Sequence, residues 1–309
     1  MSLALYTHPD MLGHNPGGHP EREEHPERPE RLAAVLAALE DEPLDRREAT
    51  LASRDDLSLV HPDAYLDAVF AAGQSGRRVQ LDPDTFMAPG SLPAALRAAG
   101  AVTEAVRAVA RGEIDRAFCA VRPPGHHAEP NQAMGFCLLS SVAVAARVAL
   151  ASGFERVAIV DFDVHHGNGT QAAFETEPRV LFASMHQWPL YPGTGAESET
   201  GVGNILNVTV APDSPAEVWR RAYAERVLPA VDAFAPDLIL LSAGFDAHVR
   251  DPLAGQNLEN HDFAWMTRAL LEVARARCGG KLVSSLEGGY DLQALAGSAR
   301  AHVQALREG

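Results

Sequence analysis

The sequence predicts an α/β fold built around a parallel β-sheet. Short apolar, β-rich runs alternate with longer helical patterns along the chain, which is the pattern of βαβ units. Runs such as VAIVDF and LILLSA are apolar at successive positions, so helices are expected to cover both faces of the sheet. Of the 309 residues, 46% are apolar, which suffices for a large core, and no internal repeat or linker is visible. We therefore expect residues 1–309 to form a single domain.

The elements follow in order from the spacing of apolar residues. A helix begins near Pro29, after a long loop over residues 8–30 that is dense in His, Pro, Gly, Glu and Arg. The β-rich runs predict five strands: Ala117–Val121, Val157–Phe162, Val180–Ser184, Leu238–Ser242 and Leu282–Leu286. The helical patterns predict five further helices: Leu92–Ala110, Ser140–Ala151, Ala216–Ala235, Phe263–Arg277 and Leu292–Leu306. Two more long loops, residues 185–203 and 246–260, are expected to carry function.

Every segment with unusual chemistry directly follows a predicted strand. AFCAV leads into RPPGHH, VAIV into DFDVHHGNG, LILLSA into GFDAH, and KLVSSL into EGGYD. In an open parallel sheet, ligands bind outside the carboxyl ends of the strands. These four segments are therefore expected to meet at one edge of the sheet.

The composition excludes several classes of function. The formal net charge is −15, with 26 basic and 41 acidic residues, so the chain lacks the cationic surface that nucleic-acid binding requires. This charge would attract a cationic partner such as a lysine-rich peptide or a polyamine, although solubility alone also explains it. The cysteines form no CxxC pair, so no disulfide framework or thiolate zinc site is expected: Cys119, Cys137 and Cys278. No apolar run approaches the ~20 residues that span a bilayer, and the N-terminus lacks signal-peptide features, so we expect a cytoplasmic protein without membrane contacts.

The segment DFDVH is the strongest candidate for a metal site. Asp161, Asp163 and His165 are two positions apart, so their side chains point the same way in an extended backbone. Asp246 ends a second strand in SAGFDAH. Alone it would be interpreted as a helix cap, but beside DxDxH it is a natural third ligand. Two carboxylates and one histidine leave a coordination position open, as catalytic zinc requires, and this oxygen-rich set also suits Fe²⁺ or Mn²⁺.

The tandem pair His126 and His127 in RPPGHHAEP is the candidate acid–base pair. Pro-Pro-Gly makes a rigid segment that turns at Gly125, and in a turn neighbouring side chains can face the same cleft. Asp161 and Asn168 are candidate partners of the two imidazoles. A carboxylate favours the imidazolium and an amide does not, so the two histidines would titrate differently and divide acid and base work. In isolation the pair would be interpreted as exposed loop histidines.

Tyr290 and two aromatic loop segments complete the candidate site. Tyr290 follows two glycines in EGGYD, and its hydroxyl could hydrogen-bond a carbonyl that becomes an oxyanion. Gly135-Phe136 and Leu190-Tyr191-Pro192 could line a narrow apolar slot for an alkyl chain, although ordinary packing explains each of them alone. His186 follows a strand and is a candidate partner near the cleft. The other histidines are interpreted mainly as polar loop residues: His8, His14, His19, His25 and His61.

Together these motifs resemble those of the histone deacetylase family, specifically its class II-like bacterial members. HPERPERL, RPPGHH, GFC, DFDVHHGNGTQ, YPGTG, SAGFDAH, DPLAG and LEGGYD occur in that family's order, over about residues 14 to 306. Single pieces such as GGY are common, whereas the combination is specific. The resemblance implies the arginase/deacetylase fold, a single three-layer domain with a central eight-stranded parallel sheet between helices.

The resemblance also implies roles for individual residues. By motif position, the zinc ligands are Asp163, His165 and Asp246. His127 corresponds to the general base and acid, and His126, paired with Asp161, to its electrostatic partner. Tyr290 corresponds to the residue that polarises the acyl carbonyl. Asn168 stands where class I members carry Asp, which supports the class II assignment.

The substrate site is implied by the same resemblance. The walls of a tunnel for an acyl-lysine chain correspond to Gly135, Phe136 and Tyr191. Asp84, in the LDPDTF loop, corresponds to a rim carboxylate that holds the substrate backbone, and the Gly289 backbone is expected to approach the substrate. Leu253 in DPLAG occupies a position where polyamine-selective members carry Glu, which favours a neutral acyl amide. A structural potassium ion near the zinc would be held by Asp161, Asp163, His165 and Ser184.

We therefore expect zinc-dependent hydrolysis of acyl amides, above all of acetyl-lysine side chains in proteins or peptides. A hydrolase of acetylated polyamines or another small acetylated amine would share every catalytic residue; Leu253 counts against it and the net acidity for it. A non-hydrolytic binder of acylated ligands is disfavoured because both tandem histidines and Tyr290 are present. An arginase-like ureohydrolase would need a larger carboxylate set for two manganese ions. The sequence leaves acyl length and oligomeric state open.

Overall fold

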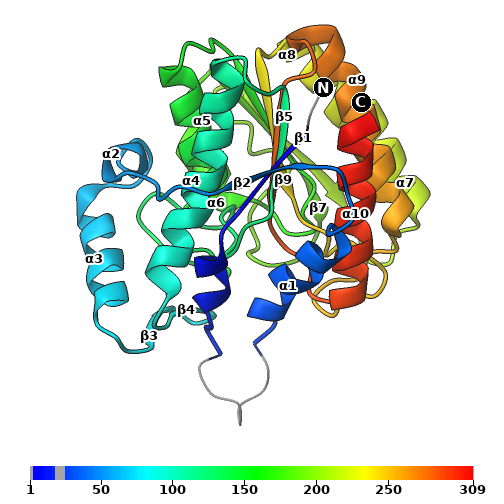
Figure 1. The fold of residues 1–309 in the computed structure, drawn as a ribbon. Coiled ribbons are helices and arrows are strands. Elements are labelled where there is room, and N and C mark those ends of the chain that lie inside the picture. Colours follow the sequence, from blue (N-terminus) through cyan, green and yellow to red (C-terminus); the bar gives the residue numbers. More distant parts are fainter. Residues whose placement is uncertain (1–2, 18–24, 309) are drawn as a thin grey trace.

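A central parallel sheet of eight strands organises the computed structural model, which describes residues 3–17 and 25–308 (Figure 1). The strands lie in the order β2-β1-β5-β10-β9-β6-β7-β8, and every neighbouring pair is parallel. Their bounds are β1 Leu3–Thr7, β2 Asp45–Glu48, β5 Arg116–Cys119, β6 Val157–Asp161, β7 Val180–Gln187, β8 Ile205–Val210, β9 Leu238–Ala243 and β10 Leu282–Leu286. A separate antiparallel hairpin joins β3 Val79–Asp82 to β4 Thr85–Met87.

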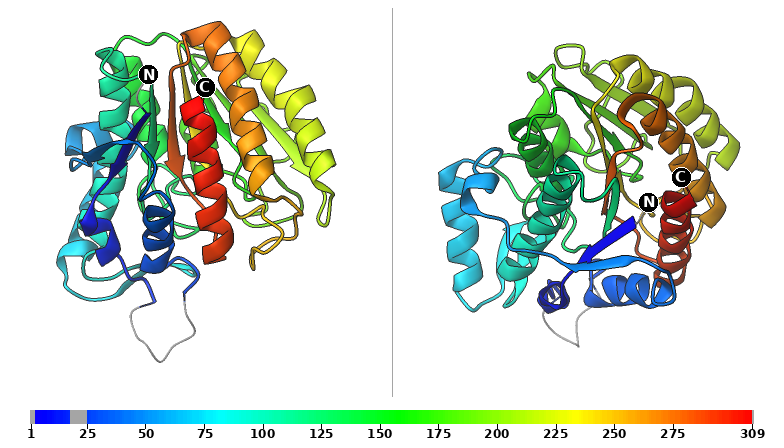
Figure 2. Two further views of the ribbon diagram at one scale, coloured as in Figure 1. Left: turned by 45° about the vertical axis from the view of Figure 1, so that its right-hand side comes forward. Right: turned by 45° about the horizontal axis from the view of Figure 1, so that its top comes forward.

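Helices cover both faces of the sheet, as the apolar strands predict. Helices α4 and α5 lie on one side, whereas α9 and α10 lie on the other with α1 beside α10 (Figure 1). Figure 2 shows the same three layers from two further directions. The helices are η1 Pro9–Gly13, α1 Pro29–Ala38, α2 Arg54–Leu57, α3 Asp63–Gln74, α4 Ser91–Ala110, α5 Ser141–Ala151, α6 Asn168–Phe174, α7 Ala216–Ala222, η2 Tyr223–Val227, α8 Leu228–Phe234, α9 Asn260–Cys278 and α10 Leu292–Glu308.

The five predicted strands are confirmed, but the sheet contains three more. Strand β2, with the sequence DRRE, lies at one edge of the sheet, and β8, with the polar residues Asn207 and Thr209, lies at the other. Edge strands carry charged or alternating residues because one side of them is open, so they lack the continuous apolar signal of central strands. Strand β7 runs on to Gln187, which shortens the predicted loop over residues 185–203.

The predicted helices are also confirmed, with one interruption. The helix expected over Ala216–Ala235 contains a π-helical turn at Tyr223–Val227, which ends two residues before Pro229. Proline lacks a backbone N–H and disturbs the regular hydrogen-bond ladder, which accounts for the wider turn. Helix α1 begins at Pro29 as predicted, whereas α3 and α6 were not predicted.

A buried ionic network anchors the segment before α1 to the sheet. The carboxylate of Glu27 accepts hydrogen bonds from Arg122 Nε and Nη2, both at 2.7 Å, and lies 3.2 Å from His14 Nε2. His14 and His61 lie in loops, as interpreted, but both side chains are buried rather than open to solvent. His61 instead bonds the carbonyl of Pro130 and the N–H of Ser140. His19 lies outside the described residues.

Candidate active site

The segments that follow β5, β6, β9 and β10 meet at the carboxyl edge of the sheet, as predicted. Backbone N–H groups lock these segments together: Gly288 donates to Asp163 Oδ2 at 2.8 Å, and Val164 donates to Asp246 Oδ1 at 2.9 Å. A side chain at Gly288 would overlap the carboxylates of Asp163 and Asp246. The first glycine of EGGYD, Gly288, is therefore required because the backbone passes close to both carboxylates.

Asp163, His165 and Asp246 form a buried cluster whose ligand atoms lie within 4.8 Å of one another. His165 Nδ1 lies 3.1 Å from Asp163 Oδ1 and also 3.1 Å from Asp246 Oδ2. Burial disfavours a charged imidazole, but hydrogen bonds with these two carboxylates raise the pKa of His165 to about 10. The carboxylates of Asp163 and Asp246 therefore concentrate negative charge around Nδ1 of His165.

This donor set fits a divalent metal ion. Bonds of about 2.0–2.2 Å to carboxylate oxygen and imidazole nitrogen place tetrahedral ligands roughly 3.3–3.5 Å apart, close to the separations seen here. Two carboxylates and one imidazole match the composition of a catalytic zinc site with an open position. The three predicted ligands are thus brought together, and they alone among the described residues form such a cluster.

The tandem histidines face the same cleft, with ring centroids 4.0 Å apart. His126 Nδ1 lies 3.0 Å from Asp161 Oδ2, and His127 Nδ1 lies 2.8 Å from Asn168 Oδ1. Burial opposes a charge on either ring. The carboxylates of Asp163 and Asp161 nevertheless raise the pKa of His126 well above its ordinary value. Burial and the neighbouring His126 lower the pKa of His127 well below its ordinary value.

The two rings therefore differ in charge near neutral pH, although they are adjacent in sequence. Because an amide oxygen can only accept, His127 Nδ1 carries the proton that it shares with Asn168, and Nε2 remains a base. Asn168 is oriented in turn by its own donation to Glu129 Oε1 at 2.9 Å. Glu129 was not singled out from the sequence, because nothing in its local pattern distinguishes it from a surface residue.

A pocket of about 220 Å³ leads to these groups. Its lining comes from seven separate places along the chain: Asp84, His127, Gly135, Phe136, His165, Leu190, Tyr191, Leu253 and Tyr290. The rings of Phe136 and Tyr290 meet edge to face at 5.8 Å, and those of His127 and Tyr191 at 5.2 Å. Gly135 has a φ of +55°, and any side chain there would overlap the ring of His127.

Comparison with known proteins places this arrangement in a family. The sequence profile of the histone deacetylase domain matches residues 25–306. The chain belongs to the histone deacetylase family. It is 38% identical to a probable deacetylase of Archaeoglobus fulgidus, over 95% of this chain and 82% of that protein. It is 43% identical to the histone deacetylase-like amidohydrolase of Pseudomonas aeruginosa, over 80% of this chain and 66% of that protein.

Solved structures agree with the sequence comparison. The crystal structure of the HDA15 HD domain covers 99% of this chain, and 91% of that chain is matched, with a TM-score of 0.94 and 37% identity. The predicted arginase/deacetylase fold is thereby confirmed. Membership of a deacetylase family supports a hydrolase that acts on acetylated substrates, and the family is generally metal-dependent. Among the described residues, no helix is long and apolar enough to cross a membrane.

Two residues hold Tyr290 of this histone deacetylase family member in place. Neither of them was predicted as a site residue. Asp251 accepts hydrogen bonds from the backbone N–H groups of Tyr290, at 2.7 Å, and Leu253, at 3.0 Å. Arg31 donates to the carbonyl of Gly289 at 2.6 Å and lies over the Tyr290 ring. Asp251 lies in the family motif DPLAG and Arg31 in HPERPERL, so the signal that could identify them is their place in these motifs.

The remaining predicted site residues fall near the pocket but not all on it. Asp84 lines the rim and accepts a hydrogen bond from Gly135 N at 3.0 Å. Gly289 is not part of the lining, so direct contact between its backbone and a ligand in the pocket is not supported; its carbonyl faces Arg31. Ser184 is the register partner of Asp161, and its hydroxyl lies 2.9 Å from His186 Nδ1. The other nitrogen of His186, Nε2, lies 3.0 Å from the Gly195 carbonyl, so His186 contacts none of the three candidate metal ligands directly.

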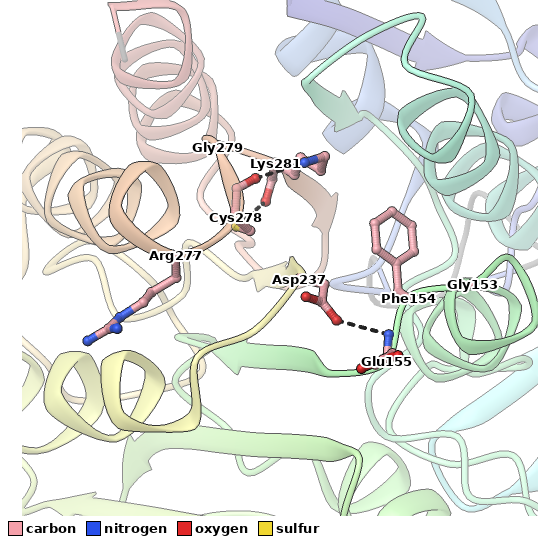
Figure 3. A pocket seen from close by; sticks show the side chains of 8 residues that line it. All are labelled: Gly153, Phe154, Glu155, Asp237, Arg277, Cys278, Gly279 and Lys281. Carbon is pink, nitrogen blue, oxygen red and sulfur yellow. Dashed lines mark hydrogen bonds between the residues drawn. The ribbon is translucent and has the colours of Figure 1, made fainter.

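A second hollow, of about 560 Å³, lies at the opposite, amino edge of the sheet. Figure 3 shows its lining around the starts of β6, β9 and β10, where Asp237 accepts a hydrogen bond from the backbone of Glu155. Lys281 donates to the carbonyl of Cys278, so its ammonium caps the end of α9. None of the predicted site residues lines this hollow. Asp237 and Lys281 make their hydrogen bonds here with backbone atoms of neighbouring turns.

Proposed function

We propose that the protein is a zinc-dependent amidohydrolase that deacetylates lysine side chains in proteins or peptides. The carrying observation is that one narrow pocket is lined by His127, His165 and Tyr290. His165 belongs to the candidate metal triad with Asp163 and Asp246, and the His126 ring lies against that of His127. These are the groups that metal-assisted hydrolysis of an amide requires. A zinc ion bound by Asp163, His165 and Asp246 would act as a Lewis acid on the acyl carbonyl and lower the pKa of water.

The protein side chains would supply the proton transfers. His127 is neutral and oriented by Asn168, so its Nε2 can take the proton from the attacking water and later give it to the leaving amine. His126, held as an imidazolium by Asp161, would contribute positive charge next to the developing oxyanion. The hydroxyl of Tyr290 would donate a hydrogen bond to the same oxygen. Its pKa is raised well above the ordinary value by burial, which keeps the phenol protonated.

The shape of the pocket supports a slim acyl amide as substrate. Phe136 and Tyr191 both line the pocket, which gives it the aromatic surface that an aliphatic lysine chain would pack against. Leu253 presents an apolar side chain at the rim, where it offers no partner to a distant ammonium group. Asp84 at the rim can accept hydrogen bonds from a peptide backbone.

A small acetylated amine, such as an acetylated polyamine, is the second candidate substrate. It is supported by the acidic mouth of the pocket, where Asp82 lies beside Asp84, and by the net charge of −15. Fe²⁺ is proposed as the alternative to zinc at the metal site. We also propose a potassium ion near Asp161 and Ser184, a single-domain organisation and a cytoplasmic location.

Turnover on a panel of substrates tests the proposal. The zinc-reconstituted protein is assayed at matched concentrations on an acetyl-lysine peptide, a trifluoroacetyl-lysine peptide and acetylated polyamines, with a hydroxamate as inhibitor control. Preferred, hydroxamate-sensitive cleavage of the lysine peptides is expected. Preferred cleavage of polyamines would overturn the interpretation of Leu253, and no turnover on any substrate would contradict the hydrolytic function.

A further inference from the structure

We propose that Glu287 is a positioning residue that fixes the turn carrying the tandem histidines. The inference rests on the proposed hydrolytic function, because it assigns the means by which the acid–base pair is held. Glu287 follows β10, and its side chain is buried, with 1% of its surface exposed. It is not part of the pocket lining, so it would act through the turn rather than on substrate.

The contacts of Glu287 are made to the backbone of the turn. Its Oε2 atom accepts hydrogen bonds from Gly125 N at 2.6 Å and from His126 N at 3.2 Å. Both N–H groups lie in an irregular segment between β5 and α5, where no neighbouring strand can accept them. Buried N–H groups need an acceptor, and Oε2 of Glu287 is the acceptor that these two groups share.

The other side of the turn is closed by protein backbone. A side chain at Gly125 would meet the backbone of Leu139 and Ser141 at 3.0 Å or less. The turn is therefore held between the start of α5 and the carboxylate of Glu287. A change on the Glu287 side would let the turn shift, and it would shift the imidazole rings with it.

The same stretch of chain also positions other catalytic groups. Gly288 donates to the metal-cluster carboxylate of Asp163, and Tyr290 lies in the pocket. Residues 287–290 thus contact the histidine turn, the metal cluster and the substrate pocket in succession. Glu287 would fix the distance between the histidine turn and the other two.

The second carboxylate oxygen of Glu287, Oε1, can be replaced by an amide group without the loss of a hydrogen bond to the turn. Among the described residues, Glu287 Oε1 is buried without a hydrogen-bond partner, and so are the hydroxyls of Ser285 and Ser242. Ser285 is two residues from Glu287 and is the register partner of Ser242, so these side chains share a face of the sheet. In Glu287→Gln, the retained oxygen can accept from the turn, while the new amide group faces this hydroxyl-bearing surface.

Steady-state kinetics of Glu287→Gln and Glu287→Leu test the proposal. Leucine removes the acceptor at similar volume, so kcat should fall by about 100-fold, the loss that a misplacement of about 1 Å can cause. KM should stay within about threefold, because no contact with substrate is lost. Glutamine keeps an acceptor, so kcat should recover to within about tenfold of the unmodified protein.

A matched variant separates positioning from general destabilisation. Glu42 is also a buried carboxylate, but it pairs with Arg300 and Arg307, and none of these residues lines the pocket. Glu42→Leu should lower thermal stability while leaving kcat unchanged. Bound zinc is measured for all variants and should remain stoichiometric in both Glu287 variants.

A spectroscopic readout is independent of turnover. The short hydrogen bond to Glu287 should shift the Gly125 amide proton downfield. It can be observed after ¹⁵N-glycine and ¹³C-proline labelling, which selects the four Pro-Gly pairs of the chain. Glu287→Leu should move this resonance upfield, and Glu287→Gln should largely restore it. Inactivity of the unmodified protein would contradict the proposed function while this measurement still tests the contact.

Two results would overturn the role of Glu287. One is a Glu287→Leu variant with kcat within threefold of the unmodified protein. The other is a Glu287→Gln variant that loses as much activity as Glu287→Leu, since charge rather than the acceptor would then be what matters.

Discussion

At the scale of single residues, the site makes identical side chains chemically different. His126 and His127 are neighbours in sequence, and their rings are 4.0 Å apart. Carboxylates stabilise a proton on the first, whereas burial and the charge of the first keep the second neutral. Since two adjacent imidazolium ions would repel each other in a buried site, only one ring carries charge.

Tyr290→Phe should reduce turnover by about 10²–10³-fold, because one oxyanion donor would be lost from a dry site. The ring would remain against Phe136 and under Arg31, so folding and zinc content should not change. Turnover is measured on the acetyl-lysine peptide and zinc by atomic spectroscopy. Turnover close to that of the unmodified protein would contradict the oxyanion role.

Asp246→Ala should abolish both zinc binding and activity. The variant removes one of the three ligand atoms that lie within 4.8 Å of one another. Zinc content after dialysis against a weak chelator is the measurement, with Asp232→Ala as control because Asp232 is an exposed partner of Arg277. Retention of one zinc per chain in the Asp246 variant would refute the ligand assignment.

At the scale of elements, the sheet is tied to its helices through polar as well as apolar contacts. His302 of α10 is fully buried and bonds the hydroxyl of Thr267 in α9, at 2.6 Å, and that of Ser284 in β10, at 2.9 Å. This one imidazole therefore joins a strand to the two helices that cover it. Burial lowers the pKa of His302 to about 3, so it stays neutral in the folded protein.

The stability of the fold should fall as pH decreases from about 6.5 towards 3. The unfolded chain takes up a proton on His302 below its ordinary pKa of about 6.5, whereas the folded protein does not. The slope from this residue reaches about 1.4 kcal/mol per pH unit. Urea denaturation at pH 7.5 and 5.0 should show a smaller pH effect in His302→Gln.

The exposed His261 of α9 provides the control, since His261→Gln removes a histidine without opening the core. An undiminished pH effect in His302→Gln would show that His302 is not part of this acid sensitivity.

At the scale of the whole molecule, residues far apart in sequence are held by one buried carboxylate. Glu27 receives two hydrogen bonds from Arg122 and contacts Arg31 and His14, all of them buried. Arg31 in turn reaches the carbonyls of Glu287 and Gly289. The segment before α1 is thereby connected to the ends of β5 and β10, which carry catalytic groups.

Glu27→Ala should lower the free energy of unfolding by about 3–5 kcal/mol, because Arg122 would be left buried without its carboxylate partner. The measurement is urea denaturation at pH 7.5. Glu40→Ala, at an exposed position after α1, should change the free energy by less than about 0.5 kcal/mol. A loss below about 1 kcal/mol in the Glu27 variant would mean that Arg122 finds another partner.

The sequence by itself determined the fold class, the five central strands and the residue types of the site. Apolar central strands and the polar segments that follow them are local patterns, and parallel strands bring their carboxyl ends to one edge whatever their order. Family motifs then located the triad, the tandem histidines and the tyrosine. Only the tertiary structure decided the rest. The edge strands β2 and β8 and the partners Glu129, Asp251 and Glu287 depend on register and burial. Such contacts join residues from distant parts of the chain, so no local pattern records them.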